Sequence, residues 1–191
     1  RPHVSLAHSM GGAIALATIS QGLVKVDAAA FCAPMWGLKS RFLGMRYLVW
    51  AMRATGRAGD YAIQPGPPET FETNIVTHDK KHWEMQRALI EARPDLELGP
   101  VTWGWLGASL NILDTFTKPK TLQQVTIPVF VASAEEEQLV DNASHEKICA
   151  KLPDCEHVVV EGAMHEILME TEDRRQEFWE GFHRLLKRAD I

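Results

Sequence analysis

Three polar side chains, each placed shortly after an apolar run, have the types and the order needed for nucleophilic catalysis. Ser9 follows the apolar residues 4–7, an acidic loop occupies residues 135–142, and His165 follows the apolar residues 157–160. A serine hydroxyl becomes a nucleophile when a histidine takes its proton and a carboxylate holds that histidine. The chain order serine, acid, histidine therefore predicts acyl transfer through a serine.

The residues around Ser9 predict a strand, a tight turn and a helix, with the helix over residues 13–19. A nucleophile elbow needs this order, because the turn lifts the serine Oγ above the edge of the sheet. Strand and helix nearly touch there, so we expect Ala7 and Gly11 to be small for that reason. Ala7 replaces the first glycine of the usual G-x-S-x-G pattern, and a methyl group can be accommodated. The backbone N–H of Met10 is expected to supply one oxyanion donor.

His165 is the expected general base, because it follows a turn at Gly162 and an imidazole can be unprotonated near neutral pH. The remaining histidines show no spacing typical of metal ligands, so we expect neither a metal nor a cofactor. We interpret them as solvated or packing residues: His8 beside the nucleophile, and His78, His82 and His145 on polar stretches of helical character.

Four apolar runs predict the strands of a parallel sheet covered on both faces. They comprise residues 4–7, 26–33, 127–133 and 157–160. The carboxyl ends of parallel strands meet at one edge, where the loops are expected to hold the site. Residues 171–188 carry one apolar stripe, which predicts a structural helix packed on this sheet.

The segment between Pro34 and Thr121 is too long for a simple connection and too apolar for a disordered linker. Helical patterns occur at residues 41–52 and 79–92. We therefore predict a core of residues 1–35 and 119–191 and a helical cap of residues 36–118. The cap holds five of the six tryptophans, which either line a pocket for an acyl chain or only pack the cap onto the core: Trp36, Trp50, Trp83, Trp103 and Trp105.

Composition excludes several classes of protein. A net charge of −5 gives no basic field for nucleic acid. The three cysteines, Cys32, Cys149 and Cys155, contain no C-x-x-C pair, which indicates buried thiols in a reducing compartment rather than disulfides or a zinc ribbon. No apolar run approaches the roughly 20 residues that span a bilayer. We expect a cytoplasmic protein, either soluble or attached peripherally to a membrane through the cap, and infer no protein partner.

The chain starts at Arg1 and not at an initiator methionine, and residues 1–7 look like a strand already under way. We expect strands that precede it in a longer protein, so an N-terminal signal cannot be judged. The second oxyanion donor of this chemistry comes from an earlier loop. This chain alone is therefore expected to be poorly active.

Three motifs together resemble the bacterial lysophospholipase and monoacylglycerol lipase branch of the α/β-hydrolases, over essentially the whole chain. They are residues 7–12, 134–142 and 162–168. The resemblance implies the α/β-hydrolase fold with a helical lid, and hydrolysis of a lipid carboxylic ester through an acyl-enzyme. It does not distinguish a lysophospholipid from a monoacylglycerol.

The resemblance also implies that Glu137 is the acid of the triad, at a position where monoacylglycerol lipases typically carry Asp. Glu is one methylene longer, so the loop could sit slightly back and still reach His165. Asp141 is the alternative acid. Its other role would be to cap a helix over residues 143–151.

Other functions remain open at this point: an aminopeptidase, an esterase for small esters, or a non-catalytic protein that binds a hydrophobic ligand. An aminopeptidase would need acidic cap residues to hold an amino group, and the candidates are Glu69, Glu72 and Glu84. A lysophospholipid head group would favour a cationic contact, and the candidates are Lys39, Arg41 and Arg46.

Overall fold

A computed structural model describes residues 1–39, 44–67 and 69–191. Arg41 and the first residues of the predicted helix 41–52 lie outside the described residues. The elements follow in this order: β1 Val4–His8, α1 Ser9–Ser20, β2 Ala28–Cys32, α2 Met45–Ala54, α3 Lys80–Ala92, η1 Pro94–Leu96, α4 Trp103–Thr115, α5 Pro119–Leu122, β3 Val129–Ala134, α6 Asn142–Cys149, β4 Cys155–Val160, η2 Ile167–Met169 and α7 Glu172–Arg188.

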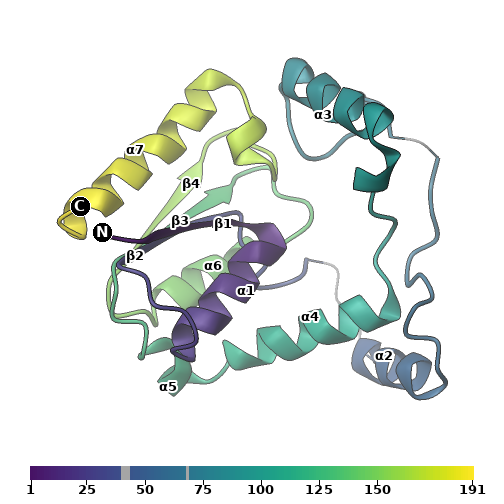
Figure 1. Cartoon of the computed structure of the whole chain (residues 1–191), viewed down its shortest axis with the longest axis horizontal. Helices are drawn as coiled ribbons and strands as arrows, with labels where there is room; N and C mark the ends of the chain where they lie inside the picture. The colour runs from purple at the N-terminus through teal and green to yellow at the C-terminus, as the bar shows by residue number, and fades with distance from the viewer. Residues whose placement is uncertain (40–43, 68) are drawn as a thin grey trace.

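The four strands form one parallel sheet in the order β1-β2-β3-β4 (Figure 1). Every residue of β2 and β3 is buried. Strands buried on both faces are apolar throughout, because helices cover a parallel sheet from both sides. The predicted parallel sheet and its four strands are thus confirmed.

Alternate residues of the central strands enter two separate cores. Ala29 and Phe31 of β2 pack in the core that α1 and α6 cover, whereas Ala28 and Ala30 pack under α7. This alternation follows from the two-residue period of a strand. The helices α1 and α6 accordingly lie on one side of the sheet and α7 on the other (Figure 1).

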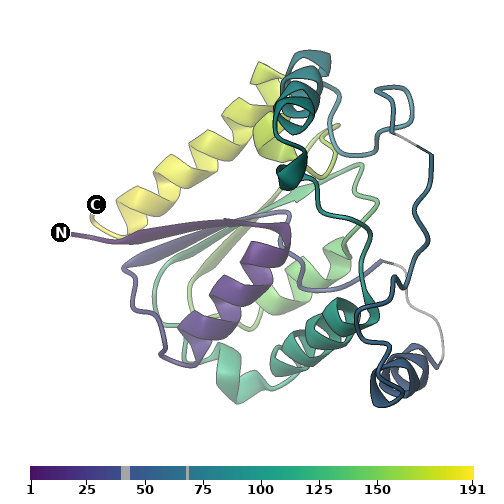
Figure 2. The same ribbon diagram turned by 45° about the vertical axis from the view of Figure 1, so that its right-hand side comes forward.

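The connection between β2 and β3 carries α2, α3 and α4, and α4 runs back alongside α1 toward α5 (Figure 2). Met45 and Val49 of α2 pack against Leu110 of α4 in a small core of their own. The predicted helix at residues 79–92 is confirmed as α3, whose N-cap Asp79 accepts hydrogen bonds from two backbone N–H groups. The division into a core and a cap stays a prediction. None of the described helices is long and apolar enough to cross a bilayer.

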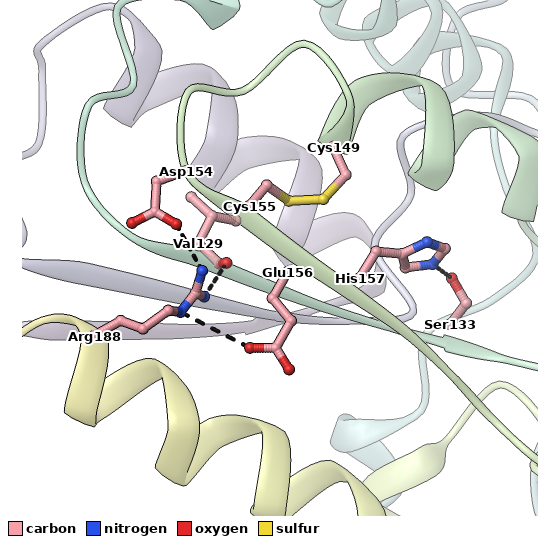
Figure 3. The surroundings of a disulfide bond; sticks show 8 residues. All are labelled: Val129, Ser133, Cys149, Asp154, Cys155, Glu156, His157 and Arg188. Carbon is pink, nitrogen blue, oxygen red and sulfur yellow. Dashed lines mark hydrogen bonds and ion pairs between the residues drawn. A yellow bond between two sulfur atoms is a disulfide. The ribbon is translucent and has the colours of Figure 1, made fainter.

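The cysteines correct the sequence analysis, because Cys149 and Cys155 form a disulfide (Figure 3). The expectation of three free thiols was wrong, and the reducing compartment inferred from them loses its support. Cys149 ends α6 and Cys155 begins β4, so a short turn brings their Cα atoms to 5.4 Å, which suits a disulfide. Cys32 alone is a free cysteine, and it is buried.

The turn that the disulfide closes is also tied to the last helix. Arg188 of α7 donates hydrogen bonds to Asp154 Oδ1 at 2.7 Å and to the carbonyl of Val129 at 2.6 Å (Figure 3). The α6–β4 turn is therefore fixed covalently on one side and by a guanidinium on the other.

Replacement of both cysteines, C149A/C155A, is expected to lower the free energy of unfolding by about 2 kcal/mol, because the unfolded chain regains the entropy of a short loop. Urea denaturation with and without dithiothreitol measures the effect. The reductant should destabilise the wild-type protein and leave the double variant unchanged. A double variant as stable as the oxidised wild-type protein would contradict the prediction.

Candidate active site

Ser9 stands at the junction of β1 and α1 with a backbone φ of 49°. A positive φ is uncommon for a residue with a side chain and persists only where the surroundings enforce it. The conformation turns the chain sharply from strand into helix, as a nucleophile elbow requires. The serine Oγ consequently lies beyond the carboxyl end of β1.

The loop after β2 holds this turn in place. The backbone N–H of Met35 donates to the carbonyl of Ser9 at 2.8 Å, and the Trp36 indole donates to the carbonyl of Gly12 at 3.2 Å. A Cβ on Gly12 would lie 2.6 Å from the Cβ of Pro34. Close approach of the helix to this loop therefore requires glycine at position 12.

Gly11 does not have the role expected from the sequence. Among the described residues, no heavy atom outside its chain neighbours and the nearby backbone of α1 would come within 4 Å of a Cβ on Gly11. The steric requirement falls one residue later, on Gly12. It arises from the loop after β2 and not from the strand before the turn. A local motif around Ser9 cannot reveal a contact with a loop that follows a different strand.

Ser9, His165 and Glu137 lie in a hydrogen-bonded row, although they come from loops after three different strands. His165 Nε2 is 2.9 Å from Ser9 Oγ, and His165 Nδ1 is 2.7 Å from Glu137 Oε2. Because a carboxylate only accepts, Nδ1 carries a proton and Nε2 is free to accept the serine proton. The histidine and the glutamate are each 3% exposed, whereas Ser9 is half-buried.

The second carboxylate oxygen of Glu137 is also occupied. Glu137 Oε1 accepts hydrogen bonds from the backbone N–H groups of Leu139 at 2.8 Å and Val140 at 3.2 Å. Burial by itself would raise the pKa of Glu137, but the histidine and these two donors outweigh it and lower the pKa below its ordinary value. Glu137 is thus held as a carboxylate with a fixed orientation.

Asp141, the alternative acid, is engaged elsewhere. It is the N-cap of α6: Oδ1 accepts from the Ala143 N–H at 3.1 Å, and Oδ2 accepts from the Ser144 hydroxyl at 2.7 Å. The structure therefore brings Glu137, and not Asp141, to His165. These contacts match the capping role that the sequence offered for Asp141.

The loops that carry Glu137 and His165 are bonded to each other; the second, residues 161–166, is named the base loop after the role expected for His165. Glu135 Oε2 accepts from the Gly162 N–H at 2.8 Å, and the Glu136 N–H donates to the carbonyl of Ala163 at 2.9 Å. Gly162 has a φ of 62°, which allows the turn that directs the chain toward His165. Glu135, the first glutamate of the acidic run, thus holds the base loop in position.

A fully buried carboxylate, Glu170, anchors the same loop and was missed by the sequence analysis. Its Oε1 accepts from the Met164 N–H at 2.9 Å and lies 2.9 Å from His78 Nδ1, and its Oε2 accepts from Arg174 Nη1 at 3.0 Å. Burial would raise the pKa of Glu170, but these partners lower it instead. His78 is therefore a tether between the β2–β3 connection and the base loop.

His145 is also buried completely, which the polar sequence around it did not indicate. Its Nε2 lies 2.6 Å from the carbonyl of Pro34, and its Nδ1 lies 2.7 Å from Ser133 Oγ, which in turn is 2.8 Å from His157 Nε2 (Figure 3 shows the last contact). Burial lowers the pKa of His145 to about 4, so its ring is neutral. It supports the loop that holds Ser9. Ser133, a polar residue inside an otherwise apolar strand, was the one feature of the sequence that could have indicated this buried contact.

An apolar cavity of about 110 Å³ lies between α1 and α4, beside Met10. Its lining includes Met10, Ile14, Met35 and Trp105. The Trp105 indole N–H points to Met10 Sδ at 3.0 Å. A larger cavity of about 600 Å³ lies between α2 and α4, and one of about 160 Å³ is lined by Glu137 and mainly charged or polar neighbours. The cavity between α1 and α4 is the apolar one next to Ser9 in the chain, because Met10 lines it.

The remaining candidates from the sequence do not converge on Ser9. Glu69, Glu72 and Glu84 are all exposed, and Arg46 pairs with Asp114 at 2.6 Å. The Lys39 ammonium donates to the carbonyl of Glu137. In the part of the chain that the structure describes, no group of three His, Cys, Asp or Glu side chains could hold a metal ion.

A family model described as serine aminopeptidase, S33, matches residues 1–172, which include all members of the Ser9 row. The chain belongs to this family. The α/β-hydrolase fold that the motifs predicted is confirmed by this membership together with the parallel sheet.

Among curated relatives, the chain is 30% identical over 191 residues to lysophospholipase L2 of Escherichia coli K12, covering 92% of this chain and 54% of that protein. It is 27% identical over 174 residues to the probable lysophospholipase L2 of Haemophilus influenzae, covering 90% of this chain and 55% of the relative. The chain thus spans about half the length of these relatives. The predicted resemblance to lysophospholipases is confirmed.

Solved structures share the fold of this S33 member. A soluble variant of monoglyceride lipase from Saccharomyces cerevisiae superposes with a TM-score of 0.71 at 18% identity, covering 96% of this chain and 64% of that one. A thermostable carboxyl esterase from Bacillus coagulans gives 0.68 at 15% identity, covering 100% and 66%. At these identities the likeness concerns the fold.

The crowding at the elbow predicts opposite outcomes for two adjacent glycines. Gly12→Ala forces a Cβ against Pro34 and is expected to lower the free energy of unfolding by about 1–3 kcal/mol. Gly11→Ala meets open space and gains helix propensity, so stability should rise by up to about 1 kcal/mol. Urea denaturation of both variants measures the difference, and equal effects at the two positions would refute the packing argument.

Proposed function

We propose that the protein hydrolyses carboxylic esters through an acyl-enzyme, with Ser9 as nucleophile, His165 as general base and Glu137 as the acid. The observation that carries the proposal is the row of contacts at 2.9 Å and 2.7 Å that joins these three side chains. A serine, a histidine and a carboxylate in this relation activate the hydroxyl without a cofactor.

In the proposed reaction, Ser9 Oγ bonds to the carbonyl carbon of the ester while its proton passes to His165 Nε2. The imidazolium that forms is stabilised by Glu137 at Nδ1. The tetrahedral intermediate then expels the alcohol, which takes the proton from His165. In the second half-reaction, water attacks the acyl carbonyl while its proton passes to His165. His165 then returns that proton to Ser9 Oγ as the bond from Oγ to the acyl carbon breaks.

The Met10 N–H is the proposed oxyanion donor. Met10 lies in the first turn of α1, where backbone N–H groups have no acceptor within the helix, and the helix dipole favours negative charge at this end. Loss of one such donor typically costs about 10²–10³ in turnover. A second oxyanion donor would therefore contribute to the rate on the same scale.

The substrate that we propose is a lipid ester of the lysophospholipid or monoacylglycerol class. The cavity beside Met10 is lined by apolar side chains, including Ile14 and Trp105, which suits an acyl chain better than a charged group. The curated relatives, named lysophospholipase L2, point to the same class. The exposed glutamates of the connection offer no built site for an amino group.

We also propose that the cap, residues 36–118, contacts the surface on which such lipids reside. Tyr47 and Trp50 of α2 are 81% and 70% exposed, and Arg53 is exposed on the same helix. Amphipathic aromatic rings and cations favour the interface of a bilayer. Peripheral attachment therefore accounts for an apolar helix surface that the core does not cover.

The substrate class is tested by a hydrolysis panel on the full-length protein, with lysophosphatidylcholine, monoacylglycerol and a short p-nitrophenyl ester. Ser9→Ala is expected to reduce turnover of every hydrolysed ester by at least about 10³-fold, since the nucleophile is lost. Undiminished turnover in that variant would sink the proposal. A preference for the short ester would contradict only the proposal of a lipid substrate. Labelling with a fluorophosphonate, which modifies reactive serines, is a separate test, and failure to label Ser9 would favour a protein that binds a hydrophobic ligand without catalysis.

The assignment of the acid predicts a large difference between two isosteric changes. Glu137→Gln removes the partner of the His165 imidazolium and is expected to lower kcat by about 10²–10⁴-fold. Asp141→Asn keeps an acceptor at the N-cap of α6 and should change kcat less than about threefold, with a small loss of stability. Steady-state kinetics measure kcat of both variants. A larger loss of kcat in Asp141→Asn than in Glu137→Gln would make Asp141 the acid.

A further inference from the structure

His8, which the proposed mechanism does not use, lies between two acceptors. Its Nδ1 is 3.0 Å from the carbonyl oxygen of Cys32, and its Nε2 approaches Glu166 Oε1 at 3.1 Å. The Nε2 contact is chiefly an ion pair, because this nitrogen has no aligned hydrogen-bond partner. A carbonyl and a carboxylate both need a donor from the ring. The surroundings therefore favour the doubly protonated imidazolium of His8.

The charges around this pair support that protonation state. Burial would lower the pKa of His8, but the carboxylate of Glu166, the Cys32 carbonyl and the more distant charge of Glu137 raise it above its ordinary value. Burial would raise the pKa of Glu166, and Glu137 adds to that, but His8 and His165 lower it. The buried Cys32 thiol has a raised pKa and stays neutral.

The His8–Glu166 pair lies directly against the proposed catalytic pair. The rings of His8 and His165 have centroids 4.8 Å apart at an interplanar angle of 58°. The arrangement is reciprocal in sequence, since His8 precedes Ser9 and Glu166 follows His165. Ser9 and His165 are thus each adjacent in sequence to one member of the His8–Glu166 pair.

We propose that His8 and Glu166 are positioning residues that keep the surroundings of His165 electrically balanced, the carboxylate cancelling the charge that His8 places beside the base. During acyl transfer His165 becomes cationic next to His8. Without Glu166, that step would bring two positive charges to within a few ångströms of each other. Without His8, the unbalanced carboxylate of Glu166 would favour the protonated form of His165, which cannot act as a base. The inference rests on the proposed function of Ser9 and His165.

A purely structural role would have a different signature. The His8 contact with the Cys32 carbonyl joins the ends of β1 and β2, so loss of the ring could merely loosen the elbow. Such loosening would lower the reactivity of Ser9 equally at every pH. A change of charge beside the base instead moves the pH at which Ser9 becomes reactive.

The test measures the rate of fluorophosphonate labelling of Ser9 against pH in the full-length protein. His8→Asn retains an amide donor for the Cys32 carbonyl but leaves Glu166 unbalanced. The midpoint of the acid limb should then rise by about 0.5–1 pH unit, the effect of one charge at this range. The double variant H8N/E166Q removes the remaining charge and should restore the wild-type midpoint. His183→Asn, a matched change at an exposed histidine of α7, should leave the midpoint unchanged.

An unmoved midpoint in His8→Asn, or a shift that persists in the double variant, would overturn this inference while the proposed function stands. A wild-type protein that is not labelled at Ser9 would overturn the proposed function and this inference with it. Histidine nitrogen chemical shifts of the wild-type protein give a second measurement that needs no variant. His8 is expected to be more than half protonated at pH 6.5, its ordinary pKa, and a mostly neutral His8 at that pH would also overturn the inference.

Discussion

The left-handed backbone of Ser9 is the constraint on which the rest of the site depends. A residue held at a φ of 49° costs on the order of 1–3 kcal/mol, so neighbouring contacts must offset that cost. They come from the loop after β2, through the Met35 N–H and the tight contact of Gly12 with Pro34. That loop follows Ala33, which also has a positive φ, of 41°. Two adjacent strands are therefore each followed by a residue with a positive φ, and the loop after the second strand holds the turn after the first.

Support for this pair of turns extends deep into the sheet. The carbonyl of Pro34 is bonded to His145, and the buried chain continues through Ser133 of β3 to His157 of β4. A neutral His145 lets each member donate in one direction, from His157 to Ser133 to His145 to the carbonyl. Fully satisfied buried networks of this kind rigidify a core. The disulfide between α6 and β4 fixes the two elements that supply the histidines.

The sequence predicted those parts of the fold that are encoded locally. Apolar runs specify strands and the His-Ser-Met-Gly turn specifies the elbow, because both depend on neighbours in the chain. Parts set by distant contacts were missed. Gly12, not Gly11, meets the loop after β2, and Glu170 gains its buried partners only when the connection folds over the base loop. Cys149 and Cys155 pair because a helix and a strand meet at a turn, which spacing alone did not reveal.

The segment before α3 is bonded to the loop of His165 by several contacts in succession. The Glu166 N–H donates to the carbonyl of Val76 at 2.8 Å, the Thr77 hydroxyl donates to the carbonyl of Met169 at 2.8 Å, and His78 reaches Glu170. A ligand that displaced this segment would pull on the residue next to His165. The position of the segment before α3 and the alignment of His165 with Ser9 therefore depend on each other through these contacts.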